Sequence, residues 1–127
     1  MASAEVMTKR YYEEQGCTVG DGRSYNAYSK TRHDLYGFID LLAIDDNETI
    51  AIQATIGMNN LPARVQKIVE SENANRWIWG PCRRIVIVAW RKLKQRNKDG
   101  KLGKRVKYEP KIVEITLQDF EKEREDG

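Results

Sequence analysis

The chain has 127 residues, and 40% of them are hydrophobic, so we expect one domain (1–127) with a substantial core. Its formal net charge of +3 is small and is not combined with low hydrophobicity, which argues against a disordered chain. No apolar run approaches the roughly 20 residues that span a bilayer, and residues 1–10 lack the apolar segment of a signal peptide. We therefore expect no membrane contact and a cytoplasmic location.

The first 33 residues predict one helix and little other regular structure. A helix over 3–15 can be capped by Ser3, and Gly16 is a natural stop. A short strand is expected over 17–19, while residues 23–33 show no period and are interpreted as a loop or an irregular strand.

The middle of the chain predicts a hairpin followed by a helix. Two aliphatic runs, 38–44 and 49–55, have the composition of paired strands, and the polar residues 45–48 between them are typical of a turn. A helix is expected over 61–75, with Pro62 in its first turn, where a missing N–H costs nothing.

The remaining elements are a buried strand, an extension and a last helix. The unbroken apolar run 84–90 predicts a strand that is buried on both faces. Two short strands, 105–108 and 111–114, are expected on either side of Pro110, and Thr116 can cap a final helix. The element order predicts an α/β sandwich in which helices flank a mixed central sheet.

Positive charge is concentrated in one block of the sequence. Residues 83–107 contain eleven Lys and Arg but a single acidic residue, Asp99. Such a block can attract a polyanion, although a solvated surface loop would have a similar composition. The residues expected to contact a DNA backbone are Arg91, Lys92, Lys94 and Arg96.

Asp40 is the most informative candidate for a chemical role. A carboxylate inside an aliphatic strand is costly unless it is paired or binds a metal. If the hairpin turns near residues 46 and 47, Asp40 faces Gln53 across the ladder, and Thr55 points to the same side. Hard divalent cations prefer oxygen ligands in such a cluster. The alternative is that Asp40 simply faces solvent on an edge strand.

Residues 37–44 together with 50–55 resemble the core of the PD-(D/E)XK nuclease superfamily, which includes restriction enzymes, Holliday-junction resolvases and many phage nucleases. Its pattern is an Asp on one strand and Asp/Glu-x-Lys on the next, and twelve residues separate Asp40 from Gln53, as in the resolvase-like members. The resemblance implies a restriction-endonuclease-like sandwich with its core at about 3–92 and an extension at 93–127. It also implies that a glutamate of the first helix joins the site, where Glu5 stands here.

The sequence departs from that pattern at two positions. Gln53 stands where the family has Asp or Glu, so it offers a metal an amide oxygen without charge. Thr55 stands where the family has Lys and has no ammonium group. Lys67 on the following helix is the best local replacement, or it is an ordinary surface lysine, and Arg64 one turn earlier can hold a phosphate.

Two further features have two interpretations each. Asp34 can be a second carboxylate at the mouth of the site or a turn residue. Trp77 and Trp79, close to Arg76, can stack on exposed bases or can pack at the edge of the domain.

These observations predict a divalent-metal-dependent DNA endonuclease, and its resolvase-like relatives make selectivity for a DNA structure such as a junction one option. The expected cofactor is Mg²⁺ or Mn²⁺, with Asp40, Gln53 and Asp34 as ligands and with Glu5 and Lys67 as further catalytic residues. The expected partners are DNA and a second copy of the chain. The alternatives are a catalytically inactive DNA-binding module on the same fold and a small protein-interaction module.

Overall fold

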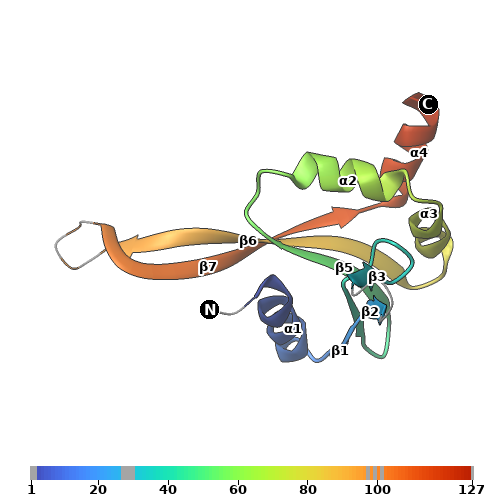
Figure 1. The fold of residues 1–127 in the computed structure, drawn as a ribbon. Coiled ribbons are helices and arrows are strands. Elements are labelled where there is room, and N and C mark those ends of the chain that lie inside the picture. The colour runs from blue at the N-terminus through green and yellow to red at the C-terminus, as the bar shows by residue number, and fades with distance from the viewer. Residues whose placement is uncertain (1–2, 27–30, 97, 99, 101, 127) are drawn as a thin grey trace.

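The computed structural model describes residues 3–26, 31–96, 98, 100 and 102–126, and it is a mixed α/β sandwich (Figure 1). This confirms the predicted fold class of a mixed sheet flanked by helices. The elements in chain order are α1 (Ala4–Glu14), β1 (Thr18–Asp21), β2 (Arg23–Asn26), β3 (Thr31–Asp34), β4 (Leu41–Ile44), β5 (Thr49–Ile56), α2 (Leu61–Val69), α3 (Glu72–Trp79), β6 (Arg83–Arg96), β7 (Leu102–Ile115) and α4 (Leu117–Asp126).

The central sheet has the strand order β1-β4-β5-β6-β7. Strand β5 pairs antiparallel with β4 and parallel with β6, and α2 and α3 form the connection that a parallel pair requires. Helix α1 covers one face of the sheet, whereas α2, α3 and α4 lie on the other (Figure 1). A second sheet contains only β2 and β3, which occupy part of the segment expected to be irregular.

The core consists of two layers, one on each face of the sheet. Alternate residues of β5 and β6 point to opposite faces, so Ile52 and Val88 pack against α1 while Ala51 and Ile87 pack against α2 and α3. All six residues 85–90 are buried, which confirms the prediction that this strand is covered on both sides. Within the described residues, no helix is both long and apolar enough to cross a bilayer.

Several element bounds differ from the predictions. The expected helix 61–75 is two helices, because Ser71 begins α3 by accepting a hydrogen bond from the backbone N–H of Ala74 at 3.3 Å. The two strands expected around Pro110 are one strand, β7. Proline is tolerated there because β7 is an edge strand, where a missing backbone donor breaks no ladder between two neighbours.

Strands β6 and β7 are both 14 residues long, and their outer parts extend away from the body as a two-stranded ribbon (Figure 1). We call the outer part, 91–96 of β6 and 102–109 of β7, the arm. Residues 98–101 have the polar composition of a turn between these strands, and of them residues 99 and 101 lie outside the described residues.

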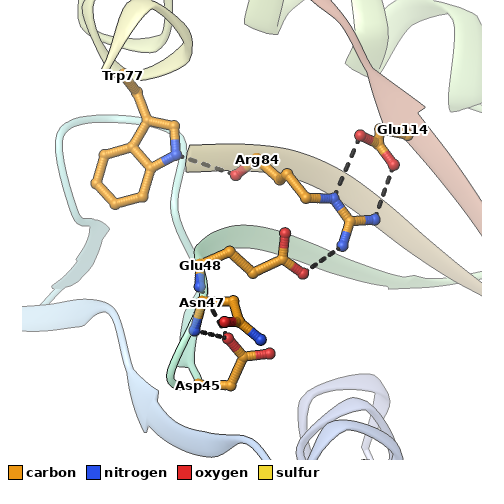
Figure 2. A network of polar contacts seen from close by, with 6 residues as sticks. All are labelled: Asp45, Asn47, Glu48, Trp77, Arg84 and Glu114. Carbon is orange, nitrogen blue, oxygen red and sulfur yellow. Dashed lines mark hydrogen bonds and ion pairs between the residues drawn. The ribbon is translucent and has the colours of Figure 1, made fainter. Parts of the chain in front are cut away.

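Arg84 ties the sheet together near the start of β6 (Figure 2). Its guanidinium donates to Glu114 through Nη2 at 2.7 Å and Nε at 3.2 Å, and to Glu48 through Nη1 at 2.8 Å. Hydrogen bonding to Glu114 raises the pKa of Arg84 above its ordinary value, despite partial burial. The β4–β5 turn is therefore linked to β6 and β7.

Candidate functional site

Asp40 lies immediately before β4, where the backbone ladder of the hairpin ends. Its backbone N–H donates to the Ile52 carbonyl at 2.9 Å, and its Oδ2 accepts from the Ala54 N–H at 3.0 Å. The carboxylate thus replaces a backbone acceptor along β5. Asp40 was expected within a strand, but β4 begins one residue later, so this placement corrects that expectation. The side chain is only 9% exposed.

A glycine lets the chain approach this point closely. The N–H of Gly22 donates to the Asp40 carbonyl at 2.8 Å. A Cβ at Gly22 would lie 2.9 Å from Cγ2 of Ile39 and 3.1 Å from its carbonyl oxygen, closer than side chains tolerate. Because no side chain intervenes, the segment after β1 can pack directly against the residues that carry the carboxylate.

Two other acidic residues act on Asp40. Its pKa is raised from 3.8 to about 7, chiefly by burial and then by the neighbouring Asp34 side chain and the negative charge of Glu5, while the Ala54 N–H lowers it. Asp34 comes from the end of β3, and Glu5 comes from the first turn of α1. The fold therefore brings two acidic residues from distant parts of the sequence close enough to Asp40 to raise its pKa, and Asp34 has the larger effect.

Gln53 lies on the next strand, and its contact is with an arginine. The residue is 7% exposed, and its Oε1 accepts a hydrogen bond from Nη1 of Arg64 at 3.4 Å. The printed register of the hairpin ends with Leu41 opposite Ile52, one residue short of the predicted pairing of Asp40 with Gln53, which stays a prediction. Thr55 follows on the same face of β5 and is partly exposed.

A small polar hollow of about 120 Å³ lies beside this part of β5. Thr55 and Arg64 line it together with Asn59 and Asn60 from the turn before α2. Arg64 therefore reaches from the buried Gln53 to an open hollow. Sequence reasoning missed the two asparagines, because an Asn-Asn pair reads as an ordinary turn.

Lys67 lies on the last turn of α2 and is exposed. It is three residues beyond Arg64, so the two side chains leave neighbouring positions of the helix surface. In the described part of the chain, the contacts place Arg64 and not Lys67 beside Gln53.

The two faces of the arm differ in how their charges are used. Arg91 forms an ion pair with Glu109 at 3.3 Å, and Lys107 approaches the same carboxylate at 3.9 Å. On the opposite face, Lys92 and Lys94 are exposed and stand across from Tyr108 and Val106, neither of which is acidic. The side chain of Arg96 lies outside the described residues, and only its backbone in β6 is described.

Among the described residues, no group of three His, Cys, Asp or Glu side chains is placed to hold a metal ion by itself. Asp34 acts on Asp40 closely enough to raise its pKa, whereas the printed contact of the Gln53 amide oxygen is with Arg64. No protein-family model, no curated protein and no solved structure matches the chain.

Proposed function

We propose that the protein is a divalent-metal-dependent DNA endonuclease, with its site at the start of β4. The observation that carries the proposal is the buried carboxyl group of Asp40 at the end of the hairpin, whose pKa is raised by burial and by the neighbouring acidic side chain of Asp34. Two carboxyl groups in contact cannot both ionise without a compensating charge. A cation satisfies that requirement, and so does a retained proton.

The donor set suits Mg²⁺ or Mn²⁺. Such a cation is commonly held by one or two carboxylates, with water and substrate phosphate completing its coordination, so a cage of three acidic side chains is not required. Asp40 and Asp34 would provide the charged oxygens, and Gln53 would provide a neutral one once its amide turns from Arg64. Glu5 would add negative charge nearby.

When bound, the cation supplies Lewis-acid polarisation of the scissile phosphate and lowers the pKa of water. The positive charge that the family pattern assigns to a lysine at position 55 would come from Arg64, which already lies beside Gln53, with Lys67 one turn further along α2. Arg64 can hold a phosphate oxygen pair through two N–H groups. The arm would contact the DNA backbone through Lys92 and Lys94.

A catalytically inactive DNA-binding module is the second candidate. The contact between Gln53 and Arg64 favours it, because a guanidinium bound to Oε1 takes the place that a cation would need. In that case the carboxyl groups of Asp34 and Asp40 keep a proton between them, and Asp40 serves only to accept the hydrogen bond of the Ala54 N–H where β4 no longer pairs with β5.

The decisive experiment incubates the protein with Mg²⁺ or Mn²⁺ and labelled linear, single-stranded, flapped and four-way DNA. We expect cleavage that EDTA abolishes and that Asp40→Asn removes, while DNA binding remains. Binding without cleavage in either metal would support the inactive module. If the protein neither binds nor cuts DNA, both the endonuclease proposal and the inactive DNA-binding module are wrong. A cytoplasmic homodimer is the setting we expect for this activity, and sedimentation with and without DNA measures the oligomeric state.

A further inference from the structure

A second hollow, of about 240 Å³, lies on the surface, and one of its lining residues follows Asp34 by two positions in the sequence. It is lined by Tyr36, Asn73, Arg76, Trp77 and Arg83. Tyr36 belongs to the turn that follows Asp34, and the Tyr36 carbonyl accepts a hydrogen bond from Nδ2 of Asn73 at 3.3 Å. The turn that follows Asp34 is thus attached to α3, and the hollow lies between that turn, α3 and the start of β6.

The aromatic side of this hollow is formed by a residue with an unusual backbone conformation. Tyr36 has φ +53, a left-handed conformation that is uncommon for a bulky residue, and it is 59% exposed. Folding therefore maintains both a strained backbone and an uncovered aromatic ring at one position. Such a combination is typical of a functional position, because packing alone would favour glycine or asparagine there.

The opposite side presents two guanidinium groups. Arg83 lies over the ring of Trp77, with its Cζ 5.0 Å from the ring centroid. That ring is fixed in turn, because its Nε1 donates to the Arg84 carbonyl at 3.0 Å (Figure 2). A Cβ at Gly80 would lie 2.7 Å from the Arg83 side chain, so Gly80 leaves the space that Arg83 occupies.

Arg76 completes the charged side, and its Nη1 donates to Oδ1 of Asn73 at 3.4 Å. None of the five described residues that line the hollow is acidic, so no carboxylate there competes for the two arginines. A hollow with an exposed aromatic ring and two arginines matches the chemistry of a nucleotide, which has a flat base and an anionic phosphate. Its volume is below that of typical drug-sized sites, which fits one nucleotide better than several.

We propose that this hollow holds one unpaired nucleotide of the DNA substrate, with the base on Tyr36 and a phosphate between Arg76 and Arg83. The inference rests on the proposed function in taking DNA as the substrate. A nucleotide of an intact duplex cannot reach Tyr36, because its base is stacked and paired. The hollow therefore gives a preference for DNA that contains a single-stranded segment next to a duplex, with the unpaired nucleotide held by the turn that follows β3.

The test compares two fluorescent DNA probes in EDTA, a blunt duplex and the same duplex with a short single-stranded extension. Fluorescence anisotropy gives both dissociation constants. Affinity for the blunt duplex reports backbone contacts such as those of the arm, whereas the ratio of the two affinities reports the hollow. We expect the parent to prefer the extended probe about tenfold, as one stacked base would give.

Variants test whether the hollow causes the preference for the extended probe. Tyr36→Asn removes the ring but suits the left-handed backbone, and Arg83→Gln removes the charge, so both should bring the ratio close to one. Tyr36→Phe keeps the ring and should keep the ratio, as should Arg10→Gln, which removes one exposed positive charge on α1. Thermal melting checks that each variant is folded.

A parent ratio of one, or an unchanged ratio in both Tyr36→Asn and Arg83→Gln, would overturn the inference. These measurements need no metal, so they are separable from the proposed nuclease activity. A protein that shows the ratio but cuts no DNA in Mn²⁺ retains the nucleotide site and loses the endonuclease proposal. A protein that cuts DNA but shows no ratio retains the endonuclease proposal alone.

Discussion

Asp40→Asn should stabilise the metal-free protein by an amount that grows with pH. The pKa of Asp40 rises from 3.8 to about 7 on folding, a difference of about three units, and each unit corresponds to about 1.4 kcal/mol. The limiting penalty for ionising Asp40 in the folded protein is therefore about 4 kcal/mol. Since the site is near the surface and solvent screens part of the charge, we expect about half of this, roughly 2 kcal/mol.

The sign of this pH dependence follows from the number of protons that the folded and the unfolded states bind. Between pH 4 and pH 7 the folded parent holds a proton on Asp40 that the unfolded chain has lost, so its free energy of unfolding falls as pH rises. The stability that the folded protein gains by binding this proton is fully present below about pH 4 and is lost above about pH 7. Asparagine does not titrate, and its amide oxygen can still accept from the Ala54 N–H. The free energy of unfolding of the variant should therefore exceed that of the parent by an amount that increases with pH.

Urea unfolding of both proteins in EDTA, in steps from about pH 4 to about pH 8, measures the effect. The difference between the two free energies of unfolding should change by roughly 2 kcal/mol across this range. Adding Mn²⁺ at pH 8 should raise the melting temperature of the parent and not of the variant. Parallel pH profiles for the two proteins would show that folding does not raise the pKa of Asp40, and the reasoning for a cation at this site would fail with it.

Three further outcomes are expected. Replacing Lys92 and Lys94 by Gln should weaken binding to all DNA sequences about equally, and it should reduce by about two the slope of log affinity against log salt concentration. Arg91→Gln should have a smaller effect, because Arg91 is already paired with Glu109. Anisotropy titrations at several salt concentrations measure the affinity and the slope of each variant. Gln53→Glu should tighten Mn²⁺ binding, since a carboxylate adds Coulomb attraction, and unchanged affinity by calorimetry would exclude Gln53 as a ligand. Arg84→Met should lower the free energy of unfolding by about 1–3 kcal/mol, because two acceptors lose a charge-assisted partner; a loss below about 0.5 kcal/mol in urea titrations would mean that water replaces it.

Much of the sheet could be predicted because its signals are local. The aliphatic runs on either side of 45–48 predict a hairpin, and the structure pairs Leu41 with Ile52, in the register that the turn implies. The unbroken run that ends at Trp90 predicts a strand covered on both faces, and β6 lies inside the sheet. Thr116 and Asp119 predict the start of the last helix, where the Thr116 N–H donates to Oδ2 of Asp119 at 2.7 Å. Each of these depends on periodicity or on residues within a few positions.

Contacts between distant segments could not be predicted in the same way. The sequence marks Asp40 as an unusual buried acid, but only the packing of β3 and α1 brings Asp34 and Glu5 close enough to raise its pKa. The length of the arm also escaped prediction, because the basic residues after Trp90 continue a strand that pairs only with β7. The hollow at Tyr36 depends on a left-handed turn meeting α3. The raised pKa of Asp40 and the hollow at Tyr36 both depend on distances between packed elements. A local sequence pattern does not contain those distances, because they are decided only when the elements pack together.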